Sequence, residues 1–553
     1  MKSGLRCTYV ILMVCVIVPF TGLGAYAQSA SSSRPDSASL LRDTKPNTGA
    51  ATRQHSDGLT VAPTQKRPDV APGGAKVQIN EVLIQGASIF TQASLLELIG
   101  HIPDERYDMA GLQSFAVKIT DYYKQNGYPF AYAYLPAQLL SDGSLIIEVL
   151  EGRYGAITLS QGDASPIWPA LLGPGTAAPY LNTLRAGDVI NQDKLSRSVL
   201  ILKDVPGSTF TSVLRPGAEL GTADLEVAVS QKRRWDGASS IHNYGNTYSG
   251  DITGRVSLDY YQFLMFADIL SFSVSDTDGD RREYVSTYNF PLGGKGLRGG
   301  LLLSRSKYSL SEDFEGFSGK AQTASLSLRY PHLRSTKTNL YSSLKYNYDK
   351  LSDALEGAIL NEKTYRSFSY SLNFDHTDDW LGGGISYGIF TLTRGSIQSG
   401  VEAEIEDQTY TKVVLNASRN QVLPGPLSLF INGQLQASSA MLDSLEHISL
   451  GGPYNVRAYP IGEASASEGG YLKTELLYGF DRYQAFSFYD VGYIRAEDTI
   501  QSRTLSGYGI GLRGVVNSVE VSLSLAWKDK GGISESGPEQ RSPQIWVQVD
   551  HSF

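Results

Sequence analysis

Residues 368–374 read Phe-Ser-Tyr-Ser-Leu-Asn-Phe, so an apolar side chain occupies every second position and a polar one stands between. Successive side chains of a β-strand point to opposite faces of the sheet, so this period predicts a strand with one apolar and one polar face. The same alternation is found at 325–329 and 521–527. From Trp235 to Phe553 the pattern recurs and helical periodicity is absent.

Sixteen such segments can be placed in this half of the chain. The span 231–553 holds 323 residues, about 20 for each strand with its connection, which suits a transmembrane barrel strand of about 10 residues. The sequence therefore predicts a 16-stranded antiparallel transmembrane β-barrel. The segments centre near Ser239, Leu258, Leu270, Val285, Leu302, Leu326, Leu344, Tyr370, Ile389, Val414, Ile431, Glu475, Tyr489, Ile510, Leu523 and Val547.

The connections between these segments differ in length on the two sides of the predicted barrel. Outer-membrane barrels have long external loops and short periplasmic turns. A soluble β-sandwich or propeller also alternates, so the alternation alone leaves that alternative open. The loop asymmetry and the terminal aromatic Phe553, interpreted as a barrel C-terminal signal, favour the membrane. Long polar connections are expected at 307–320, 350–362, 395–407 and 529–542, and short ones at 481–483 and 517–518.

Two smaller modules precede the barrel, at 76–152 and 153–230. In the first, strand-like residues around Val82 are followed by a short helical stretch capped by Thr91 and by a longer helix over 109–125. Two strands then close the module. The second repeats this order more loosely, with a helix over 191–203. A repeated β-α-α-β-β order predicts two similar α+β domains.

The N-terminal residues have the features of an exported protein. A basic start, an apolar run and the Ala25-Tyr26-Ala27 site predict a signal peptide over 1–27. Both cysteines, Cys7 and Cys15, lie within it, so no disulfide or thiol chemistry is expected in the mature chain. Residues 28–75 are rich in Ser, Thr, Pro, Ala and Gly, and we expect a disordered linker in which 37–41 could start one helical turn and, at most, a short plug helix.

Several function classes are disfavoured by the sequence. The formal charge of −8 disfavours a nucleic-acid partner. Gly384 to Gly388 satisfies the Gly-x-Ser-x-Gly pattern around Ser386, but it continues at strand spacing where a hydrolase requires a helix. The seven His show no metal-ligand spacing, and no phosphate-binding loop is present in the sequence. We expect no enzymatic activity, no metal and no cofactor.

Four stretches stand out as a set, 126–131, 143–153, 451–459 and 488–492. Together they resemble the TpsB transporters of two-partner secretion, a group within the BamA-like superfamily that secretes haemolysins and filamentous haemagglutinin. The resemblance implies two periplasmic POTRA domains, a barrel in the outer membrane of a Gram-negative bacterium, and insertion by the barrel assembly machinery. It also implies an unfolded TpsA-type partner, an adhesin or haemolysin, recognised by the POTRA domains and exported without ATP. The alternative is a BamA- or TamA-like assembly factor.

The resemblance further implies that the sixth outer loop, 442–469, enters the barrel lumen and that Arg457 pairs with Asp490. Strand phase agrees, because Tyr489 and Val491 share one face and Asp490 must take the other. The alternative is a loop arginine in solvent. Ala458 stands where many members have Gly. Further candidates are Gly451, Gly452, Val456 and Tyr459 in the loop, and Gly492 with the lumen-facing Lys473 and Glu475 on the wall.

Overall fold

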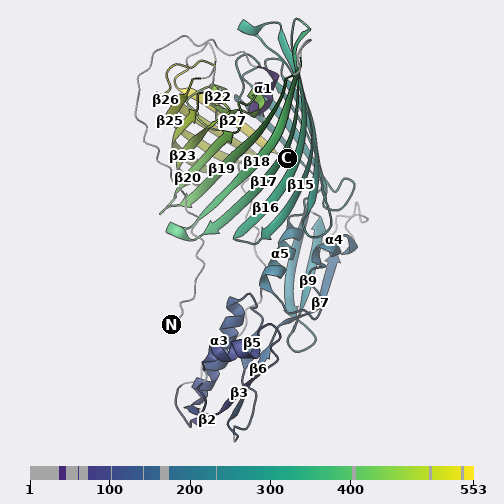
Figure 1. Ribbon diagram of the computed structural model, residues 1–553, viewed down its shortest axis with the longest axis vertical. Helices are drawn as coiled ribbons and strands as arrows, with labels where there is room; N and C mark the ends of the chain where they lie inside the picture. Colours follow the sequence, from purple (N-terminus) through teal and green to yellow (C-terminus); the bar gives the residue numbers. More distant parts are fainter. Residues whose placement is uncertain are drawn as a thin grey trace.

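The structure is a computed structural model, shown in Figure 1, with a barrel at one end and two smaller domains strung below it. The predicted signal peptide lies outside the described residues. No helix in the described part of the chain is long and apolar enough to cross a membrane. The described residues are 36–44, 60–61, 72–100, 102–140, 142–161, 174–231, 233–400, 406–496, 501–536 and 541–553.

The C-terminal half forms a closed barrel of sixteen strands, each paired antiparallel with its neighbours. The predicted barrel is confirmed, and each predicted segment centre lies within one of its strands. The strands are β10 (Trp235–His242), β11 (Thr253–Tyr261), β12 (Ile269–Thr277), β13 (Arg282–Pro291), β14 (Arg298–Ser309), β15 (Phe317–Arg334), β16 (Thr338–Leu355), β17 (Ala358–Asp378), β18 (Gly384–Gly400), β19 (Glu406–Val422), β20 (Leu427–Ser438), β23 (Gly469–Phe480), β24 (Tyr483–Ile494), β25 (Arg503–Val516), β26 (Val519–Lys530) and β27 (Gln544–Ser552).

The period-two pattern separates the two faces of the barrel wall. Phe368 and Tyr370 on β17 are exposed on the outer face, where a membrane would cover them. Ser369 points inward and pairs with Thr393 of β18 at 2.9 Å between the two hydroxyl oxygens. Pairs of this kind keep the inner wall polar while satisfying the hydroxyls that face the lumen.

Three of the expected outer connections are wrong in extent. β14 ends at 309 and β15 begins at 317. β16 ends at 355 and β17 begins at 358, and β18 ends at 400 and β19 begins at 406. Much of what was expected to be loop is therefore strand extending past the membrane. Outside the lipid no apolar face is required, so the alternation fades while the backbone pairing continues.

The first module packs a three-stranded sheet against two helices. The sheet order is β3 (Glu81–Gln85), β6 (Ser144–Leu150), β5 (Tyr132–Tyr134), and the helices are α2 (Gln92–Ile99) and α3 (Met109–Gln125). Residues Asp108 and Thr91 cap the helices through side-chain oxygens. Helix α3 buries Leu112, Phe115, Ile119 and Tyr123 in the core, and β2 (Val77–Ile79) pairs with β4 (Glu105–Tyr107) beside it.

The second module contains β7 (Arg153–Gln161), α5 (Gln192–Lys203), β8 (Ser208–Pro216) and β9 (Thr222–Gln231). The sequence did not predict its other helix, α4 (Pro174–Leu181), because the Gly and Pro residues in it obscure the helical pattern. The two-residue strand β1 (Thr60–Val61), from the predicted linker, pairs in parallel with the edge strand β8. The order of this sheet is thus β1-β8-β9-β7.

The second module is fixed to the barrel at its periplasmic turns. Arg334, at the end of β15, donates two hydrogen bonds of 2.8 Å to the carboxylate of Asp204, at the end of α5. Arg197 of α5 donates to the Pro331 carbonyl at 2.6 Å. A bidentate guanidinium–carboxylate pair fixes orientation as well as distance, so the module has a defined position under the barrel (Figure 1).

Candidate functional site in the barrel lumen

The connection between β20 and β23 (residues 439–468), which we call the lumenal loop, folds back between the barrel walls. At its tip the chain turns tightly at Gly451 and Gly452. Their φ angles of 94° and 96° are positive, a conformation that glycine adopts readily because it has no side chain. The Gly452 N–H donates to the Tyr459 carbonyl at 2.8 Å and closes the tip. A Cβ at Gly451 would lie 2.0 Å from the Pro460 oxygen. The loop also contains the short pair β21 (Ile448–Leu450) and β22 (Ala464–Ala466).

Arg457 at this tip binds two carboxylates of the barrel wall. Its Nε and Nη2 donate to the two oxygens of Asp490 on β24, each at 2.7 Å, and its backbone N–H donates to the same group at 3.2 Å. Its Nη1 donates to Glu475 on β23 at 2.5 Å. The guanidinium carbon lies 3.5 Å from the centre of the Phe488 ring. Arg457 is 4% exposed and Asp490 is 0% exposed, so the charges are held away from solvent.

The apolar residues beside the arginine fit gaps left by two wall glycines. A Cβ at Gly492 would lie 2.7 Å from a Leu450 methyl and 3.0 Å from a Val456 methyl. A Cβ at Gly507 on β25 would lie 2.2 Å from the Ala458 Cβ. The extra methyl of Ala458 is therefore accommodated opposite a residue with no side chain. Tyr459 is fully buried and donates its hydroxyl to the Lys530 carbonyl at 2.8 Å.

The structure brings together all of the predicted loop and wall residues and adds four. Glu475 was expected only to face the lumen, and it also binds Arg457. Arg513 of β25 holds the other Glu475 oxygen at 2.7 Å. Trp546 of β27 donates to the Arg457 carbonyl at 2.8 Å. Of the four added residues, only Phe488 could have been found from the sequence, because it stands two residues before Asp490 and shares its face. Arg513, Trp546 and Gly507 lie on other strands, and no local pattern shows that these strands approach the loop.

The remaining two candidates take more peripheral places. Lys473 donates to the carbonyl of Pro453 in the loop at 3.4 Å, and so faces the lumen beside the arginine. Phe553 directly follows β27, where its ring is 6.3 Å from that of Trp235 and its backbone pairs with Gly237. It belongs to the closure of the barrel and is not part of the lumenal cluster.

A second element occupies the lumen, the helix α1 (Ser37–Thr44), at the end of the barrel away from the smaller domains (Figure 1). The sequence allowed one helical turn at 37–41 and at most a short plug helix in the expected linker, and the structure has a helix of eight residues there. Ala38 and Leu41 pack with Leu351, Tyr365 and Ile397 of the inner wall. Eight residues alone would not hold a helix in water, and here the wall supplies the apolar partners.

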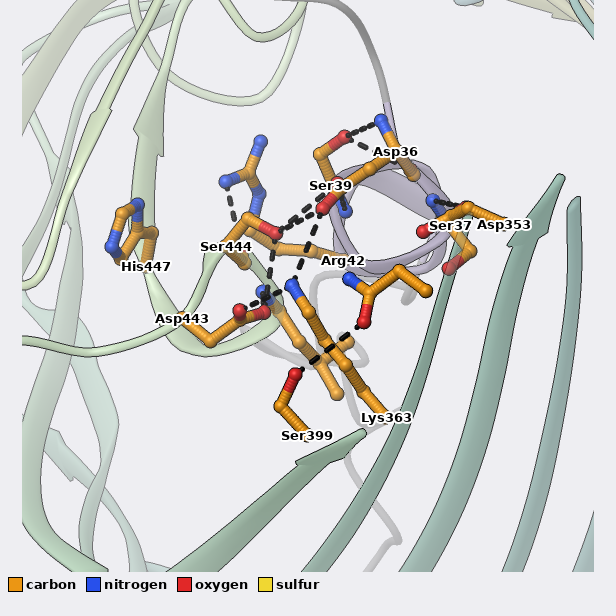
Figure 2. Close-up of polar contacts among 12 residues, drawn as sticks. Asp36, Ser37, Ser39, Arg42, Asp353, Lys363, Ser399, Asp443, Ser444 and His447 are labelled. Atoms are coloured by element: carbon orange, nitrogen blue, oxygen red, sulfur yellow. Dashed lines mark hydrogen bonds and ion pairs between the residues drawn. The ribbon is translucent and has the colours of Figure 1, made fainter. Parts of the chain in front are cut away.

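Figure 2 shows that α1 is joined to the lumenal loop as well as to the wall. The Ser444 hydroxyl donates to Asp36 at 2.9 Å, and Arg42 donates to the Ser444 carbonyl at 3.0 Å. Lys363 of β17 lies 2.6 Å from the Asp443 carboxylate and 3.9 Å from that of Asp36. The helix and the loop thus share a lysine, and moving one disturbs the other.

Comparison with known proteins shows the family to which the chain belongs. Residues 221–514, more than half of the chain, match the family described as haemolysin secretion/activation protein ShlB/FhaC/HecB. The chain belongs to this family. Residues 77–152 match the POTRA domain of ShlB type, so the first module is POTRA1, and we call the second POTRA2. The family comprises outer-membrane β-barrel transporters with periplasmic POTRA domains, which work with secreted partner proteins.

Individual relatives are distant but cover most of the chain. The heme/hemopexin transporter protein HuxB of Haemophilus influenzae is 24% identical over 79% of this chain and 78% of its own length. The outer membrane transporter CdiB of Escherichia coli is 25% identical over 83% of this chain and 80% of its own. The solved structure of CdiB from Escherichia coli has a TM-score of 0.72 at 21% identity, covers 90% of this chain and 94% of that one, and shows the same fold.

Proposed function

We propose that this transporter exports one unfolded partner protein, captured by the POTRA domains and passed through the barrel lumen. The observation that carries the proposal is the seat of Arg457, a buried arginine that holds the lumenal loop on Asp490 and Glu475 of the barrel wall. The lumen is occupied by two separate elements, α1 and the lumenal loop, and α1 is a short helix held by three buried apolar side chains and a few polar contacts. For a chain to pass, α1 would leave its place against β15 to β18.

The edge strand β8 of POTRA2 is the proposed capture site. In POTRA1 the corresponding edge is occupied: the Ala133 N–H of β5 donates to Thr120 at 2.9 Å, and the Gln138 amide bonds both the Ile146 N–H and its carbonyl. In POTRA2 a short extended segment, β1, already pairs with β8. An incoming strand of the partner would replace it by β-augmentation. A photo-crosslinker at Thr211 should then capture the partner, and one at Tyr132 should not; the reverse result would move the site to POTRA1.

Export is proposed to need no nucleotide. The sequence contains no phosphate-binding loop, and the periplasm-facing domains are small sheets with helices. The driving force would be the folding of the partner outside the cell, which makes the reverse step unfavourable.

The test is the variant Arg457→Ala, with secretion of a TpsA-type protein co-expressed with this chain as readout. We expect secretion to be lost while the barrel still inserts, because the removed guanidinium leaves Asp490 and Glu475 buried and unpaired, a cost of about 3–5 kcal/mol. Arg457→Lys should fail nearly as badly, since an ammonium cannot bind Asp490 bidentately.

The control is Arg495→Ala, which removes an exposed arginine paired with Glu468. It should secrete normally. Normal secretion by Arg457→Ala would remove the proposed role of the loop. Depletion of the protein discriminates the second function: a fall in other outer-membrane proteins would indicate an assembly factor, and unchanged levels a dedicated transporter.

A further inference from the structure

The periplasmic turn between β11 and β12 carries three consecutive apolar side chains that face outward. Phe263, Leu264 and Met265 are 46%, 63% and 41% exposed. The next two residues, Phe266 and Ala267, are buried in the core of POTRA2, where Phe266 meets the Tyr180 ring edge-on at 5.8 Å. One short turn therefore has an inner half packed into POTRA2 and an outer half with no protein over it.

The outer half is held rigidly by a buried carboxylate. Asp268 is fully buried and accepts the backbone N–H groups of Phe263 at 2.6 Å and of Leu264 and Met265 at 2.9 Å each. The Tyr288 hydroxyl donates to the same group at 2.7 Å. Because the backbone of these three residues is fixed in this way, the turn cannot rearrange to bury their apolar side chains in the protein. Such a construction is costly at a surface that meets only solvent.

The position of the turn relative to the membrane follows from the strand register. Trp235 pairs with Tyr260, Tyr260 with Leu270, and Leu270 with Tyr288, so the three aromatic residues form one row on the outer face. Rows of Trp and Tyr on the outside of a barrel lie at the level of the lipid headgroups. The Phe263 ring packs edge-on against Tyr260 at 5.9 Å and continues this row. The exposed triad is thus contiguous with the lipid-facing wall.

We propose that the turn 262–268 is a membrane anchor for POTRA2, whose three apolar side chains enter the periplasmic leaflet of the outer membrane. The ligand is the headgroup and upper acyl region of a phospholipid bilayer. While Phe263, Leu264 and Met265 hold the leaflet, Phe266 and Ala267 hold POTRA2. The domain is therefore tied to the membrane surface as well as to the barrel, and its edge strand β8 is kept at a set height below the lumen.

Fluorescence quenching by spin-labelled lipid tests the anchor in the full chain. Both native cysteines, Cys7 and Cys15, lie in the predicted signal peptide, so Leu264→Cys introduces the thiol of the mature chain that carries the environment-sensitive dye NBD. The protein is reconstituted in vesicles of phosphatidylethanolamine and phosphatidylglycerol that contain a lipid with a nitroxide near the headgroup. We expect quenching at position 264 to be about threefold or more above that of a water-exposed site, since an interfacial residue lies within the first few ångströms of the acyl region.

Three single-cysteine controls make the result decisive. Leu220→Cys replaces an apolar residue of POTRA2 that is 86% exposed and lies in the β8–β9 turn. Asn517→Cys, in a polar periplasmic turn, is a second control that should stay in water. Val256→Cys, on the lipid-facing wall, is the positive control for quenching by lipid. Met265→Cys stands in if the first variant does not fold. Quenching at 264 or 265 that does not exceed both Leu220→Cys and Asn517→Cys would overturn the anchor.

Discussion

Arg457 holds its charge where an unpaired guanidinium would be strongly unfavourable. Asp490 and Glu475 compensate it, and Arg513 compensates the second oxygen of Glu475. A buried ion cluster adds little net stability compared with apolar packing, but breaking it leaves a charge without a partner. Its role is therefore to define a single seat for the loop tip rather than to strengthen the barrel.

A steric prediction belongs to the same seat. Gly507→Ala should displace the loop tip, because the added Cβ would lie 2.2 Å from the Ala458 Cβ and 2.7 Å from the Trp527 carbonyl. We expect a loss of about 1–3 kcal/mol in the seated state, measured as faster hydrogen exchange of the amides of 451–460. The pair Gly507→Ala with Ala458→Gly should recover part of the loss, since it removes the closer of the two contacts. Equal exchange in Gly507→Ala and the parent chain would contradict this packing.

At the scale of elements, the seam between β10 and β27 is a short backbone ladder that one side chain extends. The ladder pairs Ala238 to His242 with Gln548 to Ser552, and further backbone hydrogen bonds join Gly237 to Phe553 and the Asn243 N–H to the Val547 carbonyl. Beyond it, the Asn243 amide donates to the Ile545 carbonyl at 2.8 Å and accepts the Val547 N–H at 2.8 Å, and so imitates one more strand residue. Next to it the Tyr244 ring lies 5.7 Å from both Trp546 and Tyr454, which connects the seam to the lumenal loop.

Asn243→Ala should therefore loosen the seam. Two hydrogen bonds to backbone groups are lost, worth about 1–3 kcal/mol together, and the temperature at which the barrel unfolds in detergent on a gel should fall. Asn243→Asp keeps the acceptor but sets an oxygen against the Ile545 carbonyl, and should be no better than Ala. A matched change at Asn246, in the loop that follows, leaves the seam intact. A variant as heat-resistant as the parent would show that the backbone ladder and the aromatic residues close the seam without the Asn243 side chain.

At the scale of the whole molecule, the joint between the POTRA domains decides how a captured segment is presented. Arg153 bonds Glu151 at 3.0 Å and Ser88 at 2.9 Å in POTRA1, and the Gly187 carbonyl at 2.9 Å in POTRA2. The Gln192 N–H also donates to the Gly127 carbonyl at 2.9 Å across the domains. The Arg334–Asp204 pair joins POTRA2 to the barrel. POTRA1, POTRA2 and the barrel are thus connected one after another by polar contacts of defined direction.

This joint should weaken in acid. Burial raises the pKa of Glu151, but hydrogen bonds from Ser88, the Ile89 N–H and Tyr123 outweigh it, so the pKa is lowered. A lowered folded pKa means that the ionised group stabilises the fold above its ordinary pKa of 4.5 and that this stability is lost as the pH falls through the folded value. Glu151→Gln should lose about 1–3 kcal/mol at neutral pH and a part of the acid sensitivity.

Proteolysis of the full chain in urea at neutral and acidic pH, followed at POTRA1, measures both effects. Glu97→Gln, at an exposed position of α2, is the control and should behave as the parent chain. An acid profile that is the same with and without the Glu151 carboxylate would assign the sensitivity to other groups.

Local chemistry in the sequence determined the barrel, the helices α3 and α5, and the inward direction of Asp490 and Glu475. Strand alternation and helix capping depend on residues within one turn or one pleat of each other, so they can be read without knowing the partners. The long extracellular strands, the helix α1 and the fit of Ala458 against Gly507 were decided only by the tertiary structure. Each depends on a surface supplied by residues far along the chain: Ser37 bonds Asp353, 316 positions away, and no pattern near residue 37 records that wall.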